Sequence, residues 1–289
     1  MIYVGAIVDG ILLGAMFAGV GVGLSLVFGI ANLLNLAHGA FVIVGAYVVL
    51  SLQQRLGLNI FLAAPIAAAF AFALGWSVYR WGGLARIIEA PVLMVIVFTF
   101  GLDLVLVHGI AFIFGAQSQA LRVPEAIQTV WVFGDVIIPA SRLLAAVGGV
   151  LFALGVDWIL RFTKLGRAIR ATRQDRDMAR LNGVDVSYIF AATVGIGGAT
   201  AALAGFLIAI GQPVSPDMST HYLVIAFAVA IIGGFGRIDA VVAGGIVYGI
   251  VLSVMQVWLG EGLGNAAALA FLFGLLLLRP QGLFGSQYY

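Results

Sequence analysis

Long apolar stretches recur along the whole chain, and they limit its possible folds more than any other feature. A helix of about 20 mostly apolar residues crosses the roughly 30 Å hydrocarbon core of a membrane. The chain has nine such stretches, at 6–28, 37–54, 60–80, 91–114, 142–162, 188–210, 221–235, 238–259 and 262–279. The stretch at 221–235 is short for a full crossing and is also consistent with half of a broken element. We therefore expect an all-α, polytopic integral membrane protein with eight to ten transmembrane segments.

The composition agrees with lipid as the main solvent. Charged residues make up 9% of the 289 residues and hydrophobic residues 63%. A soluble domain carries about a quarter of its residues as charged side chains. We expect residues 1–289 to form a single transmembrane domain.

Basic residues gather in one segment, and this sets the orientation. Seven of the 14 Lys and Arg residues fall between Arg161 and Arg180. Loops rich in basic residues stay in the cytoplasm, so threading the nine spans places 161–187 inside and the N-terminus outside. The loop at 115–141 is then the largest external segment, with room for a short helix. The basic residues left outside are Arg55, Arg122 and Arg142.

The sequence lacks motifs for catalysis and nucleotide binding. The only lysine, Lys164, is followed by Leu165, so there is no G-x-x-x-x-G-K-[ST] phosphate loop. The chain has no cysteine, and its three histidines lack the spacing of metal ligands. We expect no catalytic residue, no metal site and no cofactor bound by this chain. If ATP drives the protein, a partner chain binds the ATP and Mg²⁺.

The basic segment at about 163–187 is rich in helix formers. It ends at Asn182-Gly183, a C-terminal cap signal. Arg173 and Asp177 have the i,i+4 spacing of a helical ion pair. One interpretation is a loop that rests on anionic lipid. The other is a cytoplasmic helix that docks into a groove on a soluble ATPase.

The same segment resembles two motifs of ATP-binding cassette (ABC) importer permeases. Asp177-Met178-Ala179, followed after three residues by Gly183, resembles the E-A-A-x-x-x-G coupling motif, with Asp for Glu and Met for Ala. Upstream, Gly166-Arg167-Ala168-Ile169-Arg170-Ala171 resembles the G-R-A-x-R-A of the branched-chain amino acid (LIV-type) permease family.

Three further motifs of that family have counterparts in the same order. Asn35-Leu36-Ala37-His38-Gly39 resembles its N-x-A-H-G. Gly233-Gly234-Phe235-Gly236 with Gly244-Gly245 resembles its G-G-x-G…G-G, although Arg237, Asp239 and Ala240 stand where Ser, Pro and Gly are frequent. Arg279-Pro280-Gln281-Gly282-Leu283-Phe284-Gly285 resembles its closing R-P-Q-G-L-F-G.

The resemblance implies an ABC importer permease fold and a set of partners. These are a second related permease subunit, two ABC ATPases that hold ATP and Mg²⁺, and a periplasmic or extracellular solute-binding protein, with membrane lipid around and no nucleic acid. The implied function is translocation of a small polar solute, above all a branched-chain or other amino acid, across the cell inner membrane. The implied ATPase-coupling residues are Gly166, Arg167, Ala168, Arg170, Ala171, Asp177, Met178, Ala179 and Gly183.

Polar residues separate the first two apolar stretches. Two glycines and several polar side chains between Gly29 and Gly39 favour a helix break, which leaves N–H groups free to receive a carboxylate. One interpretation is structural, with Asn35 capping the second span and His38 bonded to a neighbouring helix. The other is that these residues line the solute path, with glycines of a later turn facing them. The candidate path residues are Asn32, Asn35, His38, Gly39, Gly233, Gly234 and Gly236.

Other features bear on the packing of the spans. Asp103 lies near the middle of its span and needs a hydrogen-bond partner, a proton or water there. The small-xxx-small pairs Gly10/Gly14 and Gly245/Gly249 indicate close helix contacts. An apolar run, a Gly- and Asn-rich turn and a second run occur around 20–50 and again around 222–259, consistent with half-repeats.

Alternative functions stay open at this stage. An ion-coupled secondary transporter usually places ionisable residues at the midplane, where only Asp103 qualifies. A structural subunit of a membrane complex would have no solute path. Within the same ABC family, urea, amides and aromatic acids are alternative solutes.

Overall fold

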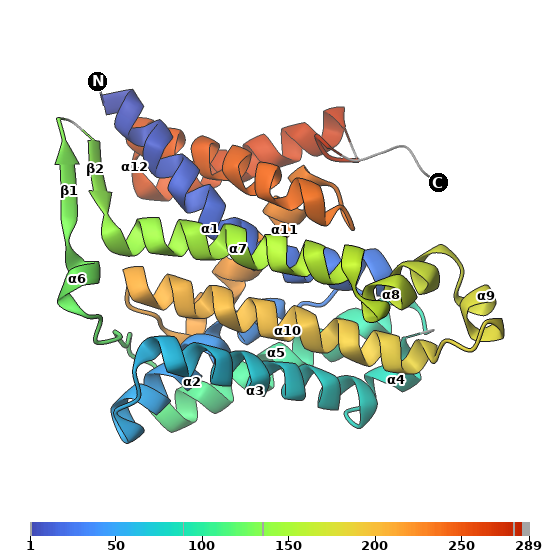
Figure 1. The fold of residues 1–289 in the computed structure, drawn as a ribbon. Helices are drawn as coiled ribbons and strands as arrows, with labels where there is room; N and C mark the ends of the chain where they lie inside the picture. The colour runs from blue at the N-terminus through green and yellow to red at the C-terminus, as the bar shows by residue number, and fades with distance from the viewer. Residues whose placement is uncertain (1, 89, 135, 280, 285–289) are drawn as a thin grey trace.

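The computed structural model describes residues 2–88, 90–134, 136–279 and 281–284, and it is almost entirely helical (Figure 1). Eight helical segments in this part of the chain are long and apolar enough to cross a membrane. The prediction of an all-α, polytopic protein is therefore confirmed. The helices that form these segments are α1 (Ile2–Ala31), α2 (His38–Leu56), α3 (Ile60–Arg80), α5 (Val92–Phe114), α7 (Ala140–Phe162), α10 (Val186–Gly211), α11 (Ser219–Gly233) and α12 (Ile238–Leu278).

The last of these helices contains two antiparallel segments. Gly260 has φ 79° and ψ 168°, which interrupts the helix in the middle of α12. Beyond the break, Gly264 lies against the backbone of Gln256, whose side chain donates to Asn265 Oδ1 at 3.0 Å. The chain therefore turns back on itself at Gly260. This hairpin accounts for the two separate apolar stretches that the sequence places at 238–259 and 262–279.

Shorter elements lie at the two ends of the bundle. The basic segment that the sequence places in the cytoplasm forms two helices, and a 3-10 turn precedes α11. In Figure 1 the strands and α8–α9 stand at opposite ends of the long helices, and we call the α8–α9 end cytoplasmic after the sequence prediction. The short elements are α4 (Leu84–Ile87), α6 (Glu125–Gln128), β1 (Val130–Phe133), β2 (Val136–Pro139), α8 (Lys164–Gln174), α9 (Arg176–Leu181) and η1 (Pro216–Met218).

The external loop contains a β-hairpin, which the all-α prediction missed. The expected short helix is present as α6, but β1 and β2 follow it as an antiparallel pair with Val130 opposite Pro139 and Phe133 opposite Val136. The strands are rich in Val, Ile, Trp and Phe, which favour a pleated backbone. Gly134 begins the turn with φ 61°.

The core is built around α1, whose residues 14–27 are all buried. This helix packs most extensively on α12, and α10 packs most extensively on α3. Gly10 and Gly14 lie directly against the backbone of α12 at Gly249 and Gly245. The predicted small-xxx-small contact is confirmed, and the missing side chains are what allow the two backbones to touch.

An order of long helix, break, short helix and long helix occurs twice. The first instance is α1, residues 32–37, α2 and α3; the second is α10, residues 212–218 with η1, α11 and the first half of α12. The sequence prediction placed the second break at the glycine turn after α11. That placement is wrong by one element, because the break equivalent to 32–37 comes before α11 rather than after it.

Candidate functional site

Two helices begin in the middle of the bundle rather than at its surface. His38, the first residue of α2, donates from Nε2 to the carbonyl oxygen of Val20 at 2.8 Å, about halfway along α1. Gly39 lies against the backbone of Ser219, the first residue of α11. The N-termini of α2 and α11 therefore meet inside the membrane. Such interrupted helices are where membrane transporters hold their substrates.

The stretch between α1 and α2 supplies the first of these breaks. Asn32 has φ 51° and is the only non-glycine residue with positive φ in the part of the chain that the structure describes. A short polar residue tolerates this left-handed conformation better than most. The sequence prediction of a helix break between Gly29 and Gly39 is confirmed, with the break at 32–37.

One polar face of α5 fixes this break. The buried residues of α5 are Val95, Thr99, Asp103 and Ile110, a single stripe along the helix. The hydroxyl of Thr99 accepts a hydrogen bond from the Leu36 amide at 3.2 Å and lies 3.2 Å from the Leu34 carbonyl oxygen. The Thr99 side chain thereby gives the non-helical backbone at 34–36 a polar partner within the protein.

One turn further along α5, Asp103 joins the two short helices. Ser219 Oγ donates to Asp103 Oδ1 at 2.6 Å, and the backbone N–H of Ala40 also approaches the carboxylate. Each contact comes from the first turn of a helix, where the dipole favours negative charge. The expected hydrogen-bond partner of Asp103 is present, but sequence reasoning did not find Ser219, which lies 116 residues away.

The candidate path residues near α2 have structural partners. Asn35 is 6% exposed, and its Oδ1 accepts from the Ala37 amide at 3.2 Å, so it holds the turn just before α2 without capping the helix itself. His38 is bonded to α1 through Nε2, while its buried Nδ1 has no hydrogen-bond partner among the described residues. These contacts favour the structural interpretation of both residues. Gly39 is covered by Ser219, whereas Asn32 is exposed at the cytoplasmic end.

The remaining candidate path residues close the cytoplasmic end of the bundle. Gly233 and Gly234 are buried where α11 ends, and the amide of Gly236 donates to Ser25 Oγ at 3.1 Å. The rings of Phe28 and Phe235 have centroids 4.1 Å apart. The end of α1 is therefore held against the turn at 234–237.

The closing motif of the chain packs on the same turn. The Leu283 amide donates to the Ile232 carbonyl at 3.0 Å, and Arg237 Nη1 donates to the Phe284 carbonyl at 2.6 Å. Two sequence motifs separated along the chain thus form one structure at the cytoplasmic end. Pro280 and Gly285 of the closing motif lie outside the described residues.

The predicted coupling segment bonds directly to the turn at 234–237 and to the end of α1. Arg173 Nη1 on α8 donates to the Gly236 carbonyl at 2.8 Å. Arg176 Nη2 on α9 donates to the Ala31 carbonyl at 3.2 Å, the last residue of α1. One short segment therefore touches both sides of the closed end.

The ion pair expected between Arg173 and Asp177 is a wrong prediction. The two residues belong to different helices, because Asp175 ends α8 and its side chain accepts from the amides of Asp177 and Met178. Asp177 instead pairs with Arg180 at 3.4 Å. Side-chain capping by Asp has stopped one helix and started another.

The predicted coupling residues divide between buried and exposed positions. Gly166 and Ala179 are buried against the chain itself, and Ala168 and Ala171 are partly covered. Gly183 ends α9 with φ 80°, which confirms the cap signal. The outer surface of α9 is apolar, with Met178 57% and Leu181 79% exposed. Arg167, Arg170 and Asp177 are exposed as well.

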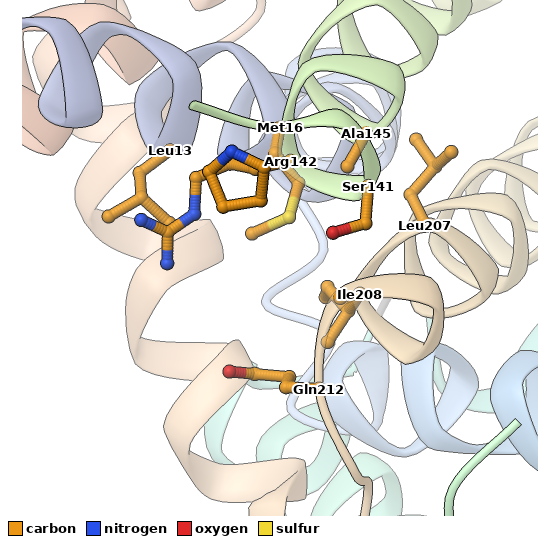
Figure 2. A pocket seen from close by; sticks show the side chains of 10 residues that line it. Leu13, Met16, Ser141, Arg142, Ala145, Leu207, Ile208 and Gln212 are labelled. Carbon is orange, nitrogen blue, oxygen red and sulfur yellow. The ribbon is translucent and has the colours of Figure 1, made fainter. Parts of the chain in front are cut away.

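Two cavities lie at opposite ends of the molecule. The external one, between α1, α7 and α10, is lined by Arg142, Ser141 and Gln212 among apolar side chains (Figure 2). Its volume is about 100 Å³, well below the roughly 300 Å³ of small-molecule sites. Beside it, Arg142 forms an ion pair with Asp9.

The cytoplasmic cavity is large enough for a small solute. It has a volume of about 520 Å³ and is mostly polar, with Asn32, Arg173 and Arg176 among its lining residues. Phe28 and Phe235 also line it. The paired rings thus border this opening.

Comparison with known proteins identifies the kind of protein that carries this site. The chain is 28% identical to the high-affinity branched-chain amino acid transport system permease protein LivH of Escherichia coli, over 96% of this chain and 94% of that protein. It is 27% identical to the corresponding protein BraD of Pseudomonas aeruginosa, over 98% and 96%. It is 30% identical to the permease protein LivM of E. coli, over 91% of this chain and 66% of that protein. No solved structure matches the chain.

The family comparison covers almost the whole chain. The model of the branched-chain amino acid transport system permease component matches residues 6–279. That range includes both helix breaks, the coupling segment and the glycine turn. The chain therefore belongs to the family of branched-chain amino acid transport permeases.

Proposed function

We propose that the chain is one of two permease subunits of an ATP-driven importer in the inner membrane. The importer carries a branched-chain amino acid or a similar apolar amino acid. A second related permease completes the passage, two separate ATPase subunits bind ATP and Mg²⁺, and an external binding protein delivers the solute. Family membership and the names of relatives such as LivH and LivM support this proposal.

The observation that carries the proposal is the placement of α8 and α9. Their outer surface presents Met178 and Leu181, while Arg173 and Arg176 hold the two sides of the cytoplasmic closure. Exposed apolar side chains on a cytoplasmic helix fit a groove on a partner protein. If an ATPase binds α9 and moves, the hydrogen bonds of Arg173 and Arg176 would transmit the movement to Gly236 and Ala31 together.

The ion-coupled alternative receives less support. It depended on Asp103 as an ion site at the midplane. That carboxylate is buried and accepts a hydrogen bond from Ser219, and it lies at the ends of two helices whose dipoles it balances. These contacts suit a structural carboxylate.

Uptake by the complete transporter tests the proposal. Vesicles would hold this chain with its permease, ATPase and binding-protein partners, and radioactive leucine would be followed with and without ATP. In a Met178→Asp, Leu181→Asp variant we expect ATP-driven uptake to fall roughly tenfold or more, because two carboxylates would be forced into an apolar groove. The volume-conserving Met178→Leu, Leu181→Met variant should transport normally. Equal uptake by the Asp variant, or no ATP-dependent uptake by the parent, would contradict the proposal.

A further inference from the structure

One side of α11 is left uncovered by the rest of the chain. Asp217, Thr220 and His221 are exposed, and Val224 and Phe227 are partly exposed. At about 3.6 residues per turn these positions share one side of the helix. We call Thr220, His221, Val224 and Phe227 the α11 open face.

The outer part of this face lies deep in the membrane. Ser219, which precedes Thr220, bonds to Asp103 at the centre of α5. It also touches Gly39, beside the His38 that bonds to the middle of α1. Thr220 and His221 therefore lie near the midplane of the bundle, one and two residues beyond these contacts.

Polar side chains at this depth indicate what covers them. An aspartate, a threonine and a histidine within five residues are costly against hydrocarbon, and such residues normally face water or a polar partner. The exposed side of α5 provides the contrast, because it carries the apolar side chains of Val97, Val105 and Phe112. The open face of α11 is thus chemically unlike this apolar surface.

We propose that the solute crosses the membrane along the α11 open face, in a hydrated path; this rests on the proposed function. The occupant is a zwitterionic amino acid with an apolar side chain. The Asp217 carboxylate and the Thr220 hydroxyl would accept hydrogen bonds from its ammonium group. Val224 and Phe227 would contact its aliphatic side chain.

The inner end of this path is the aromatic closure. The ring of Phe227 lies 6.5 Å from that of Phe235, which in turn packs on Phe28. Exposure along α11 falls from Thr220 toward this cluster. The path is therefore open on the outer half and shut by the three rings on the cytoplasmic side.

The absence of cysteine makes this path directly testable. Single Thr220→Cys and Val224→Cys variants would be assembled into the complete transporter and treated with a charged, water-soluble methanethiosulfonate. The modification would be read on this chain after separation. The matched controls are Val97→Cys and Val105→Cys, which are 62% and 70% exposed on α5.

We expect the two α11 variants to react roughly tenfold or more faster than the α5 controls, because thiols react as thiolates in water and not in hydrocarbon. Leucine-loaded binding protein with ATP should slow the reaction at Thr220→Cys. Equal rates for all four variants would overturn the proposal. So would modification of Thr220→Cys only by a lipid-soluble maleimide, or its disulfide cross-linking to the second permease without labelling by the charged reagent.

The same vesicles separate this inference from the proposed function. If the parent imports leucine with ATP but Thr220→Cys is shielded from the charged reagent, the path is wrong and the function stands. If Thr220→Cys reacts rapidly but the parent imports no leucine with ATP, the path stands and the function is wrong.

Discussion

At the scale of single residues, two buried polar side chains of α5 are paired across long separations. Thr99 bonds to residues 34 and 36, and Asp103 bonds to Ser219. In a medium without water each such group must find a partner within the protein. These few hydrogen bonds therefore hold the two helix breaks in place.

Replacement of Asp103 tests this role. Asp103→Leu leaves the Ser219 hydroxyl without its acceptor, and a buried unsatisfied group costs about 1–3 kcal/mol. We expect a lower thermal midpoint in detergent and reduced uptake. Asp103→Asn keeps an acceptor oxygen and should lie close to the parent in both measurements. Leu104→Ala, on the exposed side of α5, is the control for a general effect of mutating this helix. Identical midpoints for the Leu and Asn variants would refute the bridging role.

Hydrogen bonds of this kind could not be predicted from the sequence. The polarity of Asn35, His38 and Asp103 was visible, as was their need for partners. Their partners lie on other helices, so no local pattern identifies them. Ser219 in particular looked like an ordinary residue between two spans.

At the scale of elements, the spans were predictable because a run of about 20 apolar residues is a local signal. The break at 32–37 was predictable as well, since amides and glycines interrupt an apolar run. The break at 212–218 was not, because its polar residues and prolines resemble a connecting loop. The β-hairpin was hidden in the external loop for the same reason.

The sequence predicted one or two short helices at 166–183, which agrees with α8 and α9. The Arg173–Asp177 pair was the part that the spacing misjudged. Local capping by Asp175 prevailed and turned Arg173 and Arg176 toward the bundle. An i,i+4 ion pair and a side-chain cap were both possible at this point. A sequence pattern does not show which of the two interactions is the more stable.

The two arginines permit a test of coupling at this scale. In an Arg173→Ala, Arg176→Ala variant α8–α9 loses both charge-assisted bonds to the closure, each worth about 1.5–3 kcal/mol. We expect ATP hydrolysis to continue while leucine carried per ATP falls. Lys164→Ala removes one exposed charge from α8 and is the matched control. An unchanged ratio of leucine to ATP in the double variant would show that the contacts carry no coupling.

At the scale of the whole molecule, the bundle is closed at the cytoplasmic end and interrupted at its centre. Phe28, Phe227 and Phe235 form the closure, with the coupling segment bonded to its two sides. An apolar constriction of this kind excludes water and ions.

Loss of one ring should make the closed molecule leak. In Phe235→Ala, leucine-loaded vesicles without ATP should lose their contents roughly tenfold faster than vesicles with the parent, because a dewetted constriction becomes wet. Phe112→Ala removes a ring that is 92% exposed on α5 and should leave the rate unchanged. Efflux equal to that of the parent would mean that another barrier closes the path.

α7 sets the direction in which the second half of the chain crosses the membrane relative to the first half. The segments from α1 to α5 cross the bilayer an even number of times, so without α7 the helix α10 would enter in the same direction as α1. The added crossing reverses the second half. The first break is consequently formed as the nascent chain turns back from the cytoplasmic side, and the second as it turns back from the outside. A machinery that inserts helices from one face of the membrane thus assembles two oppositely directed halves whose short helices meet head to head.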